Sequence, residues 1–266
     1  MTDYSYENVL VEIEDEIAWV TLNRPEKRNA MSPALCYDMV DVLTRLANDP
    51  GVRVLVLTGA GEAFSAGMDL KLFFRDLDGN PAEKTRAREA DRSWNWQKLS
   101  NFPKPTIAMV NGYCFGGAFT PLVACDIAIA GQSTRFTLAY TAAGLSPDGS
   151  STWFLPRLIG LRRARELMLT NRMIGADEAR EIGVIDRVVP DDDLMDEAMA
   201  QAKAFAAGPT KAYGATKRLL QDTWTSGLET QMDRETRSIS DLTRTADARQ
   251  GIDAFLNKRK PSFRGE

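Results

Sequence analysis

The fold of this chain is decided by two glycine-bearing turns, Ala63-Phe64-Ser65-Ala66-Gly67-Met68-Asp69-Leu70 and Asn111-Gly112-Tyr113-Cys114-Phe115-Gly116-Gly117-Ala118. Each turn follows an apolar run that is typical of a buried strand. Both turns can direct free backbone N–H groups to one point. Donors from two loops that converge on one oxygen form an oxyanion hole, which stabilises the anion of a thioester or ester carbonyl. The pair of turns therefore predicts acyl chemistry.

Strand and helix patterns alternate on both sides of these turns. Ser32 followed by Pro33 predicts the start of a helix that ends near residues 48–50. Strands are predicted at residues 9–13, 17–22, 52–58, 106–110, 126–130 and 184–189, and further helices near Asp69, over residues 82–99, from Gly116, over residues 194–205 and beyond Lys211. Because strand, glycine turn and helix recur in the same order, the sequence predicts a layered α/β fold.

The length of 266 residues fits one large domain with a helical appendage. Gly208-Pro209 predicts a boundary between a core, residues 1–208, and a C-terminal helical region, residues 209–266. Short amphipathic helices at a chain end need a surface to cover. That surface is either the main domain or another subunit.

Composition excludes several classes of function. The net charge of −4 gives no reason to expect nucleic acid as a partner, and the N-terminus lacks the pattern of a signal peptide. Cys36, Cys114 and Cys125 lack metal-ligand spacing and predict reduced thiols in a cytoplasmic protein. The uncharged run over residues 106–125 contains Asn111 and Pro121, so a strand, a turn and a short helix are favoured over a membrane span.

The chain has no histidine, which excludes every mechanism that needs an imidazole base from its own residues. No metal site is expected. Proton transfer must then use Asp, Glu, Tyr, Lys or Cys. Asp148 lies in Ser146-Pro147-Asp148-Gly149, which is also a simple turn signature. Its place before an apolar helical stretch would disfavour the charged carboxylate and suit proton transfer near neutral pH.

A second interpretation concerns the turn that contains Gly59 and Gly61. It could be part of a dinucleotide fingerprint, which would indicate a nicotinamide oxidoreductase. Phe64 stands where the third glycine should be, so the match is defective. Gly116 and Gly117 also have a plain structural interpretation, because glycines let a helix start tightly against a strand.

Four segments together resemble the crotonase, or enoyl-CoA hydratase/isomerase, superfamily. They are residues 22–30, residues 63–70, residues 111–118 with Ala124-Cys125-Asp126, and residues 156–160. The resemblance implies a spiral core of repeated ββα units and a C-terminal helical region that forms trimers, often paired into hexamers. It also implies an acyl-coenzyme A thioester substrate, with no cofactor besides the coenzyme A that belongs to the substrate.

The resemblance also implies roles for single residues. The backbone N–H groups of Met68 and Gly117 would be the two oxyanion donors. The implied substrate-binding residues are Ala66, Asp69 and Leu70 at the adenine pocket, Lys27 and Arg28 near the phosphates, Tyr140, and Phe255 and Lys258 at a neighbouring subunit's ligand.

This chain departs from the hydratases at the two positions where they carry catalytic glutamates, which here are Thr120 and Tyr140. Asp148 falls where some members keep a single acidic residue, and residues 144–149 resemble 1,2-epoxyphenylacetyl-CoA isomerases and related enoyl-CoA isomerases. Residues 162–172 resemble 4-chlorobenzoyl-CoA dehalogenases, which use a histidine that this chain lacks. We therefore expect an acyl-CoA isomerase with Asp148 as proton shuttle. The alternatives are a hydratase, another acyl-CoA lyase or dehalogenase, and a non-catalytic acyl-CoA-binding protein.

Overall fold

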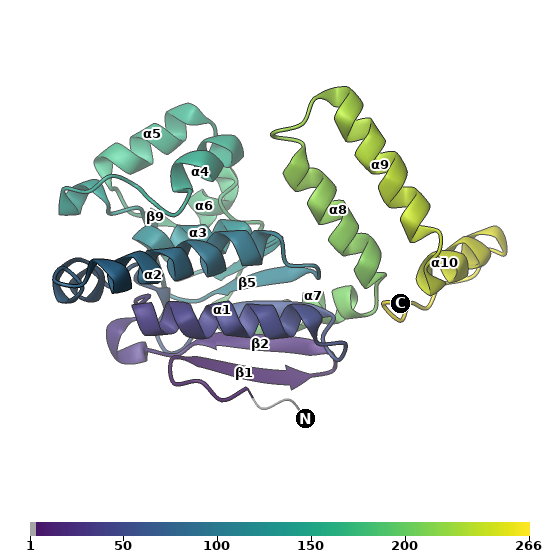
Figure 1. Cartoon of the computed structure of the whole chain (residues 1–266), viewed down its shortest axis with the longest axis horizontal. Helices are drawn as coiled ribbons and strands as arrows, with labels where there is room; N and C mark the ends of the chain where they lie inside the picture. The colour runs from purple at the N-terminus through teal and green to yellow at the C-terminus, as the bar shows by residue number, and fades with distance from the viewer. Residues whose placement is uncertain (1–3) are drawn as a thin grey trace.

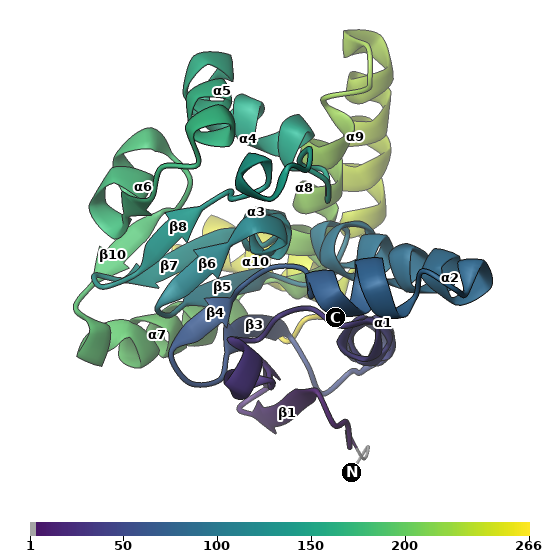
Figure 2. The same ribbon diagram turned by 90° about the vertical axis from the view of Figure 1, so that its left-hand side faces the viewer.

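The computed structural model describes residues 4–266, which form two β-sheets surrounded by helices (Figures 1 and 2). The larger sheet has the order β1-β2-β3-β5-β7-β10. Only the β1–β2 pair within it is antiparallel. Its strands are β1 (Val9–Glu14), β2 (Ile17–Leu22), β3 (Val54–Gly59), β5 (Thr106–Val110), β7 (Ile127–Gly131) and β10 (Arg187–Val189).

The smaller sheet has the order β4-β6-β8-β9, with strands β4 (Ala63–Ser65), β6 (Tyr113–Phe115), β8 (Arg135–Thr137) and β9 (Ile174–Gly175). The two opening turns of the sequence thus contain β4 and β6, which were predicted as turns alone. Two or three residues are too few to show a period of two. A strand of the larger sheet leads three times into a strand of the smaller one, which confirms the predicted ββα spiral.

The helices are α1 (Pro33–Asn48), α2 (Pro81–Arg92), α3 (Phe119–Ala124), α4 (Ser151–Ile159), α5 (Leu161–Thr170), α6 (Ala176–Ile182), α7 (Leu194–Ala206), α8 (Thr210–Asp222), α9 (Leu228–Leu242) and α10 (Ala246–Leu256). Ser32 caps α1 as predicted, since its side chain accepts a hydrogen bond from Leu35 N at 3.1 Å. The helix predicted over residues 82–99 is α2 followed by a π-helical turn, Ser93–Lys98. The helix predicted near Asp69 is a π-helical turn, Leu72–Asp76.

Helices cover both faces of the central strands of the larger sheet. Val54 and Val56 of β3 pack on the side of α7, whereas Leu55 and Leu57 belong to the main core under α1, α2 and α3. Figure 2 shows α3 and α7 on opposite sides of the sheet. Because helices cover both faces, β3 is apolar at successive positions instead of alternating.

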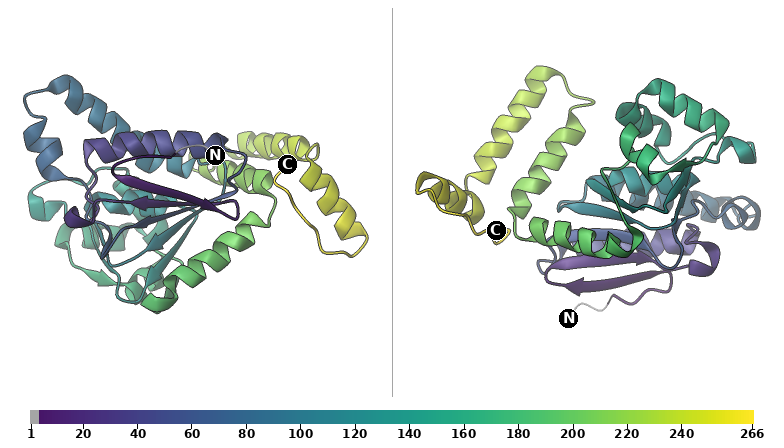
Figure 3. Two further views of the ribbon diagram at one scale, coloured as in Figure 1. Left: turned by 90° about the horizontal axis from the view of Figure 1, so that it is seen from below. Right: turned by 180° about the vertical axis from the view of Figure 1, so that it is seen from behind.

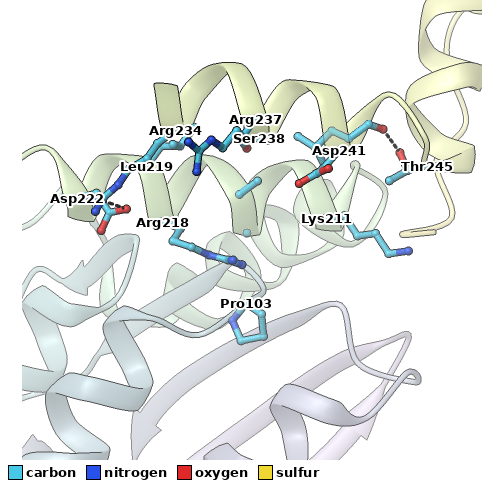
Figure 4. A pocket seen from close by; sticks show the side chains of 13 residues that line it. Pro103, Lys211, Arg218, Leu219, Asp222, Arg234, Arg237, Ser238, Asp241 and Thr245 are labelled. Atoms are coloured by element: carbon cyan, nitrogen blue, oxygen red, sulfur yellow. Dashed lines mark hydrogen bonds and ion pairs between the residues drawn. The ribbon is translucent and has the colours of Figure 1, made fainter. Parts of the chain in front are cut away.

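Helices α8, α9 and α10 lie beside the sheet layers (Figures 1 and 3). The buried Arg53 ties their start to β3, because its Nη2 donates to Gly208 O at 2.5 Å and its Nε donates to Thr210 Oγ1 at 3.0 Å. A cavity of about 620 Å³ lies between α8 and α9 and is lined by charged side chains that include the Arg234–Asp222 ion pair (Figure 4). The boundary at residue 208 as a domain limit stays a prediction.

The structure shortens one predicted strand, at residues 184–189, and divides the uncharged run over residues 106–125 into three elements. The strand predicted over residues 184–189 is only β10, because Gly183 ends α6 at φ 88° and Val184 and Ile185 enter the core without pairing. The uncharged run over residues 106–125 forms β5, β6 and α3, as the predicted strand, turn and helix require. Across residues 4–266, none of the helices has the length and apolar character to span a membrane.

Candidate active site

The two glycine-bearing turns lie against each other. Met31 forms a bridge to the first turn, because its N–H donates to Gly67 O at 2.8 Å and its carbonyl accepts from Asp69 N at 3.0 Å. A Cβ added to Gly67 would lie 2.9 Å from Gly117 N, so only glycine allows this approach. The bridge fixes the peptide of Met68 next to the second turn.

The backbone nitrogens of Met68 and Gly117, the two predicted oxyanion donors, lie near each other at this contact. A Cβ added to Gly117 would lie 3.6 Å from Met68 N and 3.9 Å from Tyr140 Oη. Within residues 4–266, no hydrogen bond uses the N–H of Met68 or of Gly117. Two unpaired N–H groups beside the same space can bind a single oxygen atom. Gly117 is the second residue of the short helical segment Gly116–Ala118.

A cavity of about 470 Å³ opens next to these donors. Three segments supply its main side chains: Met68 and Leu70 from the first turn, Asp91, Asn95 and Trp96 from α2 and the turn after it, and Tyr140 and Asp148 from the chain that precedes α4. Trp96 stacks on Phe154 of α4 with ring centroids 3.4 Å apart, which joins the turn after α2 to α4. The cavity therefore depends on contacts between distant parts of the chain.

The loop that carries Asp148 is held in an unusual backbone conformation. Gly149 has φ 56° and Ser150 has φ 68°, both in the left-handed region. The fully buried Thr120 donates its hydroxyl to Gly149 O, and a Cβ added to Gly149 would lie 2.4 Å from Thr120 Oγ1. Ser151 fixes the backbone of Asp148, because the N–H and the hydroxyl of Ser151 donate to Asp148 O at 3.1 and 2.8 Å. Thr120 thus anchors the Asp148 loop instead of facing the cavity.

The surroundings of Asp148 favour the uncharged acid. Asp148 is open to solvent at the mouth of the cavity, but nearby protein atoms raise its pKa by desolvation. The Tyr140 hydroxyl and the positive charge of Arg88 act in the opposite direction. Burial raises the pKa of Tyr140 itself, so Tyr140 remains a phenol. Its buried Oη lies near Asp148 and Ser151 without a hydrogen bond of normal geometry to either.

Of the predicted substrate-binding residues, Leu70 and Tyr140 line the cavity. Lys27, Arg28, Ala66 and Asp69 lie on or beside the first turn and do not line it. Ala66 N donates to Arg28 O at 2.8 Å, which brings the two segments together. The exposed Arg28 pairs with Glu62 at 2.8 Å, and Lys27 lies one residue before it in the exposed turn Pro25–Lys27. Asp69 pairs with Arg24 at 3.2 Å, so its side chain is already engaged.

Phe255 and Lys258 are not brought to the cavity by this chain. Phe255 lies in α10 and is 81% exposed, and Lys258 follows that helix. Figure 1 shows α10 and α2 at opposite ends of the molecule. A role for these two residues at a ligand would need a second copy of the chain.

Asp91 and Asn95 were missed by sequence reasoning. Asp91 is 7% exposed, and its Oδ1 accepts from Asn95 Nδ2 at 2.9 Å and from Cys36 Sγ at 3.7 Å. Burial, with a smaller contribution from Asp148, raises the pKa of Asp91 to about 7. Asp91 lies in a highly charged stretch that looks like a solvated helix face, so no local signal distinguishes it. Residues 4–266 contain no cluster of three or more acidic, Cys or His side chains able to hold a metal ion.

The profile of the enoyl-CoA hydratase/isomerase family matches residues 12–266. The chain belongs to this family. The crotonase-type identification made from the sequence is thereby confirmed, and the oxidoreductase interpretation of Gly59 and Gly61 is wrong. Gly59 has a structural reason instead, since a Cβ there would lie 2.2 Å from Ala63 O.

Individual family members differ in their named activities. The 1,2-epoxyphenylacetyl-CoA isomerase of Escherichia coli (strain K12) is 36% identical over 262 residues, covering 98% of this chain and 99% of that protein. The hydroxycinnamoyl-CoA hydratase-lyase of Pseudomonas fluorescens is 51% identical over 170 residues, 63% of this chain but only 61% of that protein. The crystal structure of an enoyl-CoA hydratase from Bacillus anthracis superposes with a TM-score of 0.89 at 33% identity, covering 98% of this chain and 100% of that one.

Proposed function

We propose that this member of the family is an acyl-CoA isomerase in which Asp148 moves one proton. The observation that carries the proposal is the place of the Asp148 carboxylate on the same cavity as Met68, next to the space that the N–H groups of Met68 and Gly117 face. The full-length similarity to a 1,2-epoxyphenylacetyl-CoA isomerase supports it. Thr120 supports it as well. It stands where hydratases carry a catalytic glutamate, it has no carboxyl group, and its hydroxyl is bonded to Gly149 O.

The proposed chemistry follows from these groups. The two N–H groups bind the thioester oxygen, which lets negative charge develop there when a proton leaves the neighbouring carbon. The Asp148 carboxylate accepts that proton and returns it to a different carbon, so the double bond moves and nothing is added. The Tyr140 hydroxyl lies beside the same space and contributes a further contact to the bound acyl group.

Asp148→Asn tests this proposal. We expect isomerisation of a 3-enoyl-CoA to fall by roughly a hundredfold or more, the usual scale for losing a general acid–base group. Calorimetric affinity for the thioester should stay nearly unchanged, because an amide fills the same space. Asp192→Asn, an exposed carboxylate on a distant turn, is the matched control. Wild-type isomerisation by Asp148→Asn would refute the proposal, as would a wild-type protein that isomerises none of a panel of enoyl-, epoxy- and aryl-CoA thioesters.

The assembly and the location of the protein are part of the same proposal. We propose a homotrimer or a hexamer of two trimers built through residues 209–266, with no cofactor besides the coenzyme A of the substrate and no nucleic acid or membrane partner. Cys36 and Cys114 are buried free thiols, and Cys125 is also unpaired. Such thiols support the proposal of a cytoplasmic protein, where they remain reduced.

A further inference from the structure

Asp91 is a buried carboxylate that the proposed isomerisation does not use. It is 7% exposed and lines the candidate cavity from α2. An aspartate is rarely buried unless it is paired. Among residues 4–266, no ion pair includes Asp91. Its place in a cavity wall is therefore not explained by pairing with a charge of this chain.

The protein engages only one oxygen of this carboxyl group. Asn95 Nδ2 donates to Asp91 Oδ1 at 2.9 Å, and the Cys36 thiol donates to the same oxygen at 3.7 Å. Within residues 4–266, no hydrogen bond uses Asp91 Oδ2, and this atom is not enclosed, unlike the unpaired Oδ1 of Asn95. Two donors on Oδ1 hold the carboxyl group in place. Oδ2 is then the polar atom that Asp91 offers to the cavity.

Apolar side chains surround this oxygen in the cavity lining. Phe74, Trp96 and Leu145 line the cavity together with Asp91, whereas Arg88 and Arg92 line it from exposed positions. A hydrocarbon chain that filled this space would cover Oδ2 without giving it a hydrogen bond. Covering a polar atom in this way costs the free energy of its lost hydration.

We infer that the acyl group of the substrate carries a hydroxyl that binds Asp91 Oδ2, so that Asp91 selects hydroxylated acyl-CoA thioesters. The inference rests on the proposed function, because it takes the same cavity as the acyl site. It gives Asp91 a role in specificity and none in proton transfer at carbon.

A hydroxyl group suits Asp91 in both of its protonation states. Burial raises the pKa of Asp91 to about 7, so the acid and the carboxylate are both populated near neutral pH. A hydroxyl donates to the carboxylate and accepts from the acid. An ammonium group can only donate, and a carbonyl oxygen can only accept. The hydroxyl is therefore the one of these groups that keeps its hydrogen bond in either state.

The same contact predicts discrimination against plain acyl groups. A site that hydrogen-bonds a hydroxyl of the substrate rejects the analogue without it, because a buried polar group of the site is then left unpaired. The hydroxylated ligand should consequently bind more tightly, although its acyl group is the less apolar of the two.

Calorimetry on the intact protein tests the inference with saturated thioesters, which have no double bond to isomerise. Each ω-hydroxyacyl-CoA in a series from four to eight carbons is compared with the unsubstituted acyl-CoA of the same length. At one chain length or more, we expect the hydroxylated ligand to bind roughly tenfold tighter, the scale of one hydrogen bond to a buried partner.

Two variants of Asp91 and one control locate the effect. Asp91→Leu removes both oxygens at similar volume, so it should abolish the preference without weakening the plain acyl-CoA. Asp91→Asn keeps a group that can hydrogen-bond to a hydroxyl and should retain part of the preference. Glu89→Leu removes an exposed carboxylate from the same helix and should leave the preference unchanged.

The outcomes separate this inference from the proposed function. Equal or weaker binding of the hydroxylated ligand at every chain length would overturn the inference, and this comparison needs only the wild type, even if Asp91→Leu fails to fold. A preference that survives in folded Asp91→Leu would overturn it as well. Both results leave the isomerase proposal standing. Absence of saturable binding by every thioester would instead refute the proposed function, and this inference with it.

Discussion

Thr120 has a structural role at a position where the resemblance to hydratases implies a catalytic residue. The resemblance to hydratases assigns this position to a catalytic glutamate, but here the side chain is buried and donates to Gly149 O. Gly149 and Ser150 both have positive φ, a conformation that persists only where neighbours hold it. Thr120 thus holds the backbone of the loop that carries Asp148, and it does not line the cavity.

Thr120→Val is expected to lower kcat for isomerisation by roughly tenfold to a hundredfold, because losing the bond to Gly149 O lets the Asp148 carboxylate shift. KM should change little, since the oxyanion donors and the acyl cavity remain. Steady-state kinetics would measure both. Thr120→Ser keeps the hydroxyl and should restore most of kcat. An equal loss in the two variants would show that the methyl group matters and not the hydrogen bond.

At the scale of elements, the π-helical turn Ser93–Lys98 is what aims side chains into the cavity. Trp94 and Asn95 are adjacent in the chain, yet both are buried, Trp94 in the core and Asn95 in the cavity wall. An extra residue per turn rotates the helix and allows this, and such π-bulges are common at functional sites. Helix α2 and this turn together therefore set where Asp91 and Asn95 lie.

The start of α2 gives a test of that element. Asn80 caps the helix, because its Oδ1 accepts from Glu83 N at 3.2 Å. Asn80→Ala should lower the free energy of unfolding by about 1 kcal/mol, the usual loss for an N-cap. Urea denaturation would measure it. Asn80→Asp keeps an acceptor and should be nearly neutral, so a similar loss in both variants would contradict the capping role.

At the scale of the whole molecule, the C-terminal helices expose more apolar surface than a single chain needs. Leu228 is 76% exposed. The other exposed apolar side chains of α8, α9, α10 and the α8–α9 connection are Leu220, Trp224, Met232, Ile239, Ile252, Phe255 and Leu256. Many exposed apolar side chains on neighbouring helices are typical of an interaction site, and a second copy of the chain is the partner that the family resemblance implies.

We expect light scattering at micromolar concentration to show a trimer or a hexamer for the intact chain. Leu228→Glu should shift the population toward the monomer, because an interface would then bury an unpaired charge. Leu10→Glu introduces the same charge at an exposed apolar position on β1 and should leave the assembly unchanged. A monomeric wild type would contradict the prediction.

The sequence by itself determined the features that depend on neighbouring residues. The hairpin of β1 and β2, the cap at Ser32 and the positions of the long strands follow from local periodicity and capping. The absence of histidine is a fact of composition, and it alone limits proton transfer to other groups. That backbone donors meet at the two glycine turns stays a prediction, but the positive φ of Gly67 and Gly116 is a local reason for glycine there.

Only the tertiary structure decided which distant groups share one cavity. Strands of two or three residues, such as β4 and β9, are fixed by pairing with partners far along the chain and leave no periodic signal. The burial of Asp91 depends on α1, α2 and the loop before α4 packing together, so its charge looked solvent-exposed in the sequence. Burial is a property of the packed interior, and for that reason the place of Asp91 and Asp148 on one cavity emerged only from the fold.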